Sequence, residues 1–171
     1  MMKLIFSSHL SRFAAMAIAT ASAVGICGCS HIDNHRLPRV PVNIVFWTQG
    51  DWVTHGVSGA ATYKRFIKDQ HIPANYNYTA NSYTGVGGVL LCTTYSGEPV
   101  AYDLACPYEA TANNRVFINE DSQAECPRCH SCFDVFGALG TPLSGPAAQN
   151  GYGLQVYNVG PGMNGEYMVV Y

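Results

Sequence analysis

The sequence predicts an all-β domain, and three observations carry this prediction. Charged residues make up only 12% of the chain, whereas glycine, tyrosine, valine and proline are abundant, as in sheet proteins with many turns. Several short runs alternate apolar and polar residues or are rich in β-branched and aromatic residues. Short segments with glycine, proline or serine separate these runs. We therefore expect antiparallel strands and hairpins rather than a helix bundle.

The sequence predicts short strands within residues 40–171. Residues 40–46 place Val42, Ile44 and Phe46 on one face and predict a first strand. Residues 88–95 and 99–104 are two β-type runs separated by Ser-Gly-Glu, which predicts a hairpin, and Cys92 should be buried in its first strand. Shorter strand candidates are residues 115–118, 124–125, 133–136, 154–158 and 167–170.

Residues 47–84 show no sustained strand period, so we expect an irregular insertion with a short helix near residues 61–68. Trp47 and Trp52 lie at its start. Packing against the domain is the favoured interpretation of both rings, and a shelf for a sugar or a peptide is the alternative.

The N-terminus predicts an exported protein. Lys3 and Arg12 precede an uncharged run of the length of a signal-peptide core, too short to span a bilayer comfortably. The run ends in Ile-Cys-Gly-Cys-Ser, which resembles the lipobox of bacterial lipoproteins. That resemblance implies a signal peptide of residues 1–28, a lipid on Cys29 and a polar tether of residues 29–39. An ordinary signal peptide or a single membrane-spanning anchor remains the alternative.

Residues 40–171 are the size of one domain that can bury a core. The chain has a formal net charge of −2 with nine Lys and Arg residues, which does not favour nucleic acid as a partner. No Ser-His-Asp order, phosphate-binding loop or paired-carboxylate motif stands out, so the sequence predicts no site for substrate turnover.

The domain is expected to keep five cysteines, an odd number in a compartment that oxidises exposed thiols. At least one should therefore be buried, reactive or bound to a ligand. Three of them lie in Glu-Cys-Pro-Arg-Cys-His-Ser-Cys-Phe-Asp, residues 125–134.

Two longer stretches carry a resemblance to a known family. GVLLCTTYSGEPVAYDLACPYE is followed by CPRCHSCFDVFGALGTPLSGPA and then by GLQVYNV. This order of hairpin, cysteine loop, second cysteine loop ending in Phe-Asp, glycine turn and Pro-Leu-x-Gly-Pro-Ala resembles the Rieske iron–sulfur domain over residues 87–171. The resemblance implies stacked antiparallel sheets with two cysteine-bearing loops at one tip, and assigns Pro142, Gly145 and Pro146 to a third loop covering the site. It also implies that Asp134 sets the turn after the second loop.

The family's ligand pattern is only half present. Rieske domains hold a [2Fe–2S] cluster with two cysteines and two histidines. Cys106 and Cys126 fall on the cysteine positions, but Tyr108 and Cys129 stand where the histidines belong. The resemblance thus implies Cys106, Cys126 and Cys129 as metal ligands. Candidates for a fourth ligand are Tyr108, His130 and Cys132.

Three interpretations of these residues remain open. An altered [2Fe–2S] cluster rich in thiolate should have a reduction potential that falls toward about −400 mV. A zinc or iron ion could be held by the Cys-x-x-Cys pair with Cys106 and one further ligand. In the third interpretation no metal is bound, and the thiols pack or form a disulfide. Residues 126–130 also match the covalent haem motif Cys-x-x-Cys-His, which the β-rich context disfavours.

These interpretations define two expected functions. The first is a lipid-anchored protein of the bacterial cell envelope, facing the periplasm or the cell surface, that transfers electrons to an unknown redox partner. The second is a cluster-free Rieske-like scaffold, stabilised by zinc or a disulfide, that binds or assembles with another protein. In both, the membrane is contacted through the lipid on Cys29.

Overall fold

The computed structural model describes residues 31–137, 139–162 and 167–171. Within them the chain forms eleven β-strands, two short α-helices and one 3-10 helix. The strands pair antiparallel throughout both sheets, which confirms the predicted all-β fold. The predicted signal peptide, residues 1–28, and the predicted lipid site, Cys29, lie outside the described residues.

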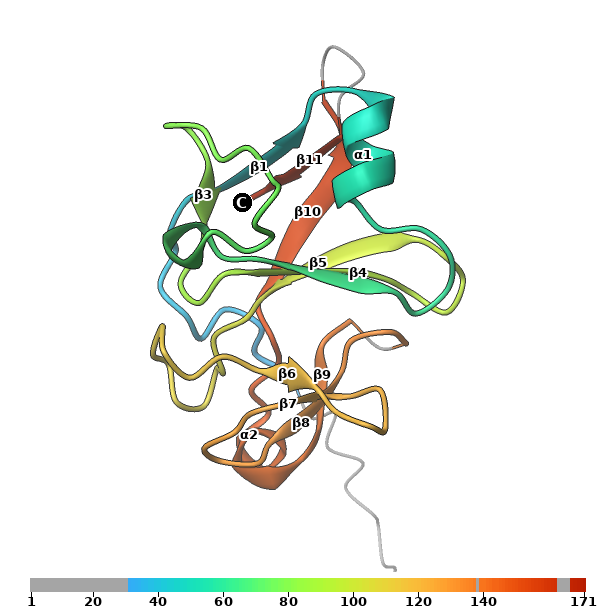
Figure 1. The fold of residues 1–171 in the computed structure, drawn as a ribbon. Coiled ribbons are helices and arrows are strands. Elements are labelled where there is room, and N and C mark those ends of the chain that lie inside the picture. Colours follow the sequence, from blue (N-terminus) through green and yellow to red (C-terminus); the bar gives the residue numbers. More distant parts are fainter. Residues whose placement is uncertain (1–30, 138, 163–166) are drawn as a thin grey trace, which may run out of the picture.

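The larger sheet has seven strands in the order β2-β4-β5-β10-β11-β1-β3. It forms the upper part of the molecule in Figure 1, where it bends so that β1 and β11 lie above β4 and β5. The bounds of its strands are β1 Val42–Phe46, β2 Tyr63–Phe66, β3 Tyr83–Thr84, β4 Val89–Thr93, β5 Pro99–Asp103, β10 Val156–Pro161 and β11 Tyr167–Val170.

The smaller sheet has four strands in the order β6-β7-β8-β9 and lies at the lower end in Figure 1. It consists of β6 Phe117–Ile118, β7 Ala124–Glu125, β8 Cys132–Asp134 and β9 Thr141–Ser144. A short helix, α2 Gly145–Asn150, follows β9 directly. The expected third loop around Pro142, Gly145 and Pro146 is therefore a strand and a helical turn.

The predicted hairpin is present as β4 and β5, whose register pairs Leu90 with Tyr102 and Cys92 with Val100. Every residue of β4 is buried, because the strand is covered on both faces. Leu90 and Cys92 belong to one hydrophobic cluster and Val89 and Leu91 to another. The hairpin is thus the layer between two cores, and the expectation that Cys92 is buried is confirmed.

The segment 47–84 differs from the sequence expectation. It contains helix α1 Gln49–His55, strands β2 and β3 and the 3-10 helix η1 Lys68–Gln70. The helix expected near residues 61–68 is wrong, because Tyr63–Phe66 pairs with β4 as a strand. Helix α1 begins at a capping box in which Thr48 and Asp51 each accept a backbone N–H from the other.

Part of the expected tether packs against the domain. Asp33 forms two backbone hydrogen bonds, donating to Gly151 at 2.7 Å and accepting from Gly153 at 3.0 Å. The side chain of Leu37 is only 3% exposed. Backbone pairing and one apolar anchor therefore hold this segment in place, which the polar, proline-containing sequence did not reveal.

The two tryptophans have different environments. Trp52 stacks on Tyr167 and meets Phe46 edge to face, as the packing interpretation predicted. Trp47 is 65% exposed.

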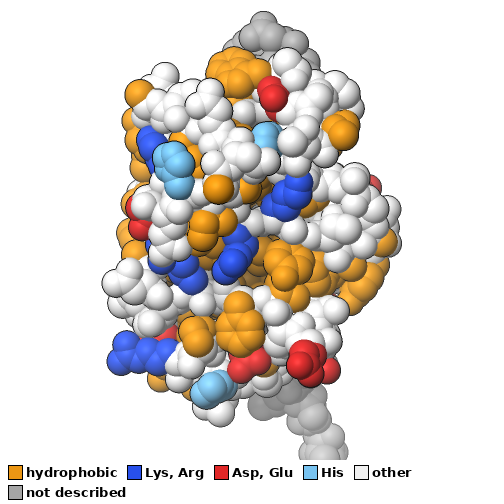
Figure 2. All heavy atoms as spheres, in the orientation of Figure 1, with side chains coloured by type: hydrophobic (Ala, Val, Ile, Leu, Met, Phe, Trp, Pro, Cys, Tyr) orange, Lys and Arg blue, Asp and Glu red, His pale blue; other side chains and the backbone are white. Residues whose placement is uncertain are grey.

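Figure 2 shows hydrophobic side chains reaching the surface between basic and acidic ones on one face of the molecule. None of the described helices is long and apolar enough to cross a membrane.

Candidate metal centre

Three of the five described cysteines converge. The Sγ atoms of Cys106, Cys126 and Cys129 all lie within 4.8 Å of one another. Cys106 Sγ and Cys129 Sγ are 3.6 Å apart. Cys106 and Cys126 are buried, Cys129 is partly exposed, and all three are free thiols. The described residues therefore contain a three-sulfur cluster, which we call the thiol cluster.

Two turns of the same shape build the thiol cluster. Cys106 begins the turn Cys-Pro-Tyr-Glu after β5, and Cys126 begins the turn Cys-Pro-Arg-Cys after β7. In each turn the residue four positions after the cysteine donates its N–H to the cysteine carbonyl, at 2.8 Å from Ala110 and 3.0 Å from His130. These two residues also share a left-handed backbone, with φ of 51° and 55°.

The proline after each cysteine explains why the sequence folds into these turns. Proline fixes φ near −65°, which suits the second position of a turn. The two turns therefore hold Cys106 and Cys126 in the same backbone geometry. Each turn is also fixed by a backbone hydrogen bond, which Cys106 N–H donates to Asn114 O and Cys126 N–H donates to Ser131 O. The repeated Cys-Pro dipeptide was the sequence signal of this similarity.

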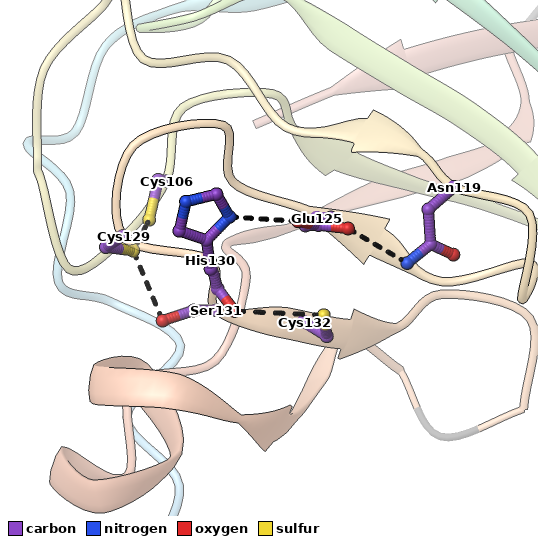
Figure 3. A network of polar contacts seen from close by, with 7 residues as sticks. All are labelled: Cys106, Asn119, Glu125, Cys129, His130, Ser131 and Cys132. Atoms are coloured by element: carbon purple, nitrogen blue, oxygen red, sulfur yellow. Dashed lines mark hydrogen bonds and ion pairs between the residues drawn. The ribbon is translucent and has the colours of Figure 1, made fainter.

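Ser131 links the thiol cluster to helix α2 and was not anticipated. Its side chain is fully buried, and its Oγ lies 3.2 Å from Cys129 Sγ, which donates to it. The same Oγ accepts the backbone N–H of Ala147 at 3.0 Å. Figure 3 shows Ser131 directly beside Cys129 and above α2. A serine between two cysteines carries no signal of burial in the sequence.

The three thiols differ in pKa because their surroundings differ. Burial raises the pKa of Cys106 and of Cys126, although nearby backbone amides in their turns favour the thiolate. Burial also acts to raise the pKa of Cys129. Hydrogen bonds that its thiolate accepts from the Ser131 hydroxyl and N–H and from the two neighbouring thiols outweigh burial, so this pKa is lowered. Cys129 is therefore the thiol of the cluster that ionises first.

Two of the other candidate ligands lie outside the thiol cluster. Neither His130 nor Cys132 places a ligand atom within 4.8 Å of all three sulfurs. Cys132 Sγ points toward the carbonyl of His130, 3.9 Å away, and lies apart from Cys106 and Cys129 in Figure 3. Tyr108 sits in the first turn with its side chain 42% exposed.

His130 has its own partners. Its Nδ1 lies 3.1 Å from Glu125 Oε1, and Glu125 Oε2 accepts a hydrogen bond from Asn119 at 3.1 Å. Figure 3 shows this chain running along the strands away from the thiol cluster. Hydrogen bonding with His130 and Asn119 lowers the pKa of Glu125. A carboxylate that holds one histidine nitrogen is also the usual support of a metal-binding histidine.

The expected role of Asp134 matches the geometry. Its Oδ1 accepts the backbone N–H groups of Phe136 and Gly137, at 3.1 and 2.8 Å. The carboxylate thus shapes the turn that leads from β8 to β9. Cys92, in contrast, lies on β4 outside the thiol cluster, and burial raises its pKa.

No family model, curated protein or solved structure matches this chain. The resemblance to Rieske domains thus rests on the sequence motifs alone. What the fold and the site define is an all-β protein with three close cysteines that could bind a metal ion.

Proposed function

We propose that this protein is a metal-centre protein of the bacterial cell envelope, in which Cys106, Cys126 and Cys129 bind a metal through thiolates. The observation that carries the proposal is the convergence of three sulfurs from two matched Cys-Pro turns. Such turns present thiolates to soft or borderline cations, of which zinc and iron are the common choices.

The sulfur spacing supports a single ion. Sulfurs at about 2.3 Å from a tetrahedral metal lie roughly 3.8 Å apart. The distance of 3.6 Å between Cys106 Sγ and Cys129 Sγ is close to this edge, and it is much longer than a disulfide bond of about 2.05 Å. Three of four tetrahedral positions can therefore be filled with little rearrangement of the turns. Iron in this site would make the protein an electron carrier, and zinc would make the site structural.

A [2Fe–2S] cluster is the second candidate, supported by the resemblance to Rieske domains. Bridging sulfides separate the thiolates of one iron from those of the other, so the three sulfurs would need to move apart. A fourth ligand would come from Tyr108, His130 or Cys132. His130 is the best supported of these, because Glu125 already holds its Nδ1 and leaves Nε2 for a metal.

The cluster-free alternative uses the same thiols differently. Oxidation of Cys106 with Cys129 would tie the two turns together in an envelope compartment and leave a scaffold for a binding partner. The proposed location rests on the N-terminal sequence, with a lipid on Cys29 and the domain facing the periplasm or the cell surface.

The test is metal analysis of the full-length protein purified without oxygen. We expect about one zinc or iron per chain and no acid-labile sulfide. Two irons with two sulfides would establish the cluster instead. Protein without metal, with Cys106 and Cys129 joined in a disulfide, would contradict the metal proposal and support the scaffold.

A further inference from the structure

A hollow at the other end of the molecule is unrelated to the thiol cluster. It has a volume of about 180 Å³ and lies between β1, β11 and the segment from Tyr76 to Ser82. Figure 1 shows β1 and β11 in the upper part of the fold, whereas the β6–β9 sheet forms the lower end. We call this hollow the β1 pocket.

One side of the β1 pocket is apolar. The outward face of β1 continues from Val45 to Trp47, and Met168 on β11 pairs with Val45 across the sheet. The indole of Trp47 is 65% exposed although it lines the pocket. An exposed indole beside a small apolar floor suits the flat, carbon-bound hydrogen face of a pyranose ring.

The rest of the lining is polar and uncharged. It offers the carboxamides of Asn43, Asn77 and Asn81 and the hydroxyl of Thr79. Asn43 donates its Nδ2–H to the carbonyl of Asn81 at 2.9 Å, and its Oδ1 is buried with no hydrogen-bond partner among the described residues. Carboxamides both donate and accept hydrogen bonds, as sugar hydroxyls do. No lining residue is charged, so the pocket suits a neutral ligand.

The backbone around the pocket disfavours an extended peptide. β1 is paired with β11 along one edge and with β3 at Val42 and Asn43 along the other. At Val45, where that second edge would otherwise be open, the Tyr76 hydroxyl accepts the backbone N–H at 3.2 Å and donates to the carbonyl at 2.8 Å. A peptide therefore cannot add to β1 as a further strand.

From these observations we infer that the β1 pocket binds one neutral sugar unit, stacked on Trp47 and hydrogen-bonded by the surrounding carboxamides. The volume of the pocket is below the 300–1,000 Å³ that is usual for larger ligands. We therefore expect it to hold a single ring of a longer saccharide. This binding is independent of the metal proposal, because the two sites share no residue.

The test screens the full-length protein against an immobilised panel of neutral, N-acetylated and charged oligosaccharides, and then titrates the best one by calorimetry. We expect a neutral or N-acetylated sugar to bind. Trp47→Ala should weaken that binding about tenfold or more through the loss of stacking. Asn77→Ala should weaken it without affecting the fold.

The matched control is Tyr95→Ala, which removes another exposed aromatic side chain, in the turn between β4 and β5. It should leave the affinity unchanged. The inference is overturned by an absence of binding across the panel, by equal affinity in Trp47→Ala and the unchanged protein, or by preferential binding of an unstructured peptide library in place of the sugars.

Discussion

At the scale of single residues, the cysteines of this chain have separate roles although they are close in sequence. Cys129 and Cys132 are three positions apart, yet only Cys129 belongs to the thiol cluster. The difference arises at His130, where the turn ends in a left-handed backbone conformation. Cys132 then lies on strand β8, outside the thiol cluster. Spacing alone could not assign these roles, because the backbone direction after His130 decides them.

The proposed metal site predicts which substitutions lower the metal content of the protein. Cys106→Ser, Cys126→Ser and Cys129→Ser should each lower the metal content per chain several-fold, because a hydroxyl is a poor replacement for a thiolate on a soft cation. Cys132→Ser should retain the metal. Plasma mass spectrometry of each purified variant measures the result, and loss of metal in Cys132→Ser would place this thiol among the ligands.

Asp103 illustrates a buried carboxyl group that holds several segments together. It accepts the N–H groups of Val86, Gly87 and Ala105, at 2.7 to 2.8 Å, and the hydroxyl of Tyr157. The side chain is fully buried between the chain that enters β4 and the chain that leaves β5. It therefore supports the backbone that leads to Cys106.

Replacing Asp103 should be costly. Asp103→Ala leaves buried N–H groups without an acceptor, and we expect a loss of about 3 kcal/mol or more in the free energy of unfolding. Urea denaturation of the variant measures this loss. Asp121→Asn, on the exposed turn between β6 and β7, should change it by less than about 0.5 kcal/mol. Similar values for both variants would contradict the structural role of Asp103.

At the scale of elements, the sequence predicted those whose side-chain pattern is local. The hairpin of β4 and β5 followed from two β-type runs around a short turn. Strand β2 was not predicted, because its residues are also compatible with a helix and are held extended by pairing with β4. Strand β9 and helix α2 were hidden by the prolines and glycine of Thr-Pro-Leu-Ser-Gly-Pro-Ala. The three converging cysteines were predicted from motifs, whereas the role of Ser131 depended on the packing of α2.

The chain just before β4 packs so closely against the residue before Cys106 that only a glycine fits at position 87. A Cβ on Gly87 would lie 2.8 Å from Ala105 Cα and 2.9 Å from Ala105 Cβ, immediately before Cys106. Gly87→Ala should therefore lower the free energy of unfolding by about 2 kcal/mol or more and reduce metal content.

Gly160→Ala is the control for this substitution. Gly160 lies in β10 with open space around its Cβ position, so calorimetric unfolding should show a change within about 0.5 kcal/mol. Equal melting temperatures for the two variants would mean that Ala105 and its neighbours adjust freely.

At the scale of the whole molecule, the two cores should respond differently to metal removal. Cys106 and Cys126 belong to the cluster that includes Phe133 and Ala147, whereas β1 and β11 pack in the other cluster. Chelation should raise amide hydrogen exchange in β6–β9 more than in β1 and β11. Exchange measured by mass spectrometry with and without metal tests this, and a uniform increase across the chain would contradict it.

The proposed anchoring also concerns the whole molecule. Cys29→Ala should abolish incorporation of a labelled fatty acid and release the protein from the membrane fraction. Cys27→Ala is the matched control and should retain both, because only the cysteine after Gly28 fits the lipoprotein pattern. Labelling that persists in Cys29→Ala would mean that another residue carries the lipid or that the segment remains as an anchor.

The two matched Cys-Pro turns have a consequence for the unfolded chain. A metal bound at both turns joins Cys106 to Cys126 and closes the loop that contains β6 and β7. Closing this loop of about 20 residues by a cross-link removes conformational entropy equivalent to roughly 3 kcal/mol from the unfolded state. The strands of the smaller sheet are only two to four residues long, so the ion would act as their reversible cross-link.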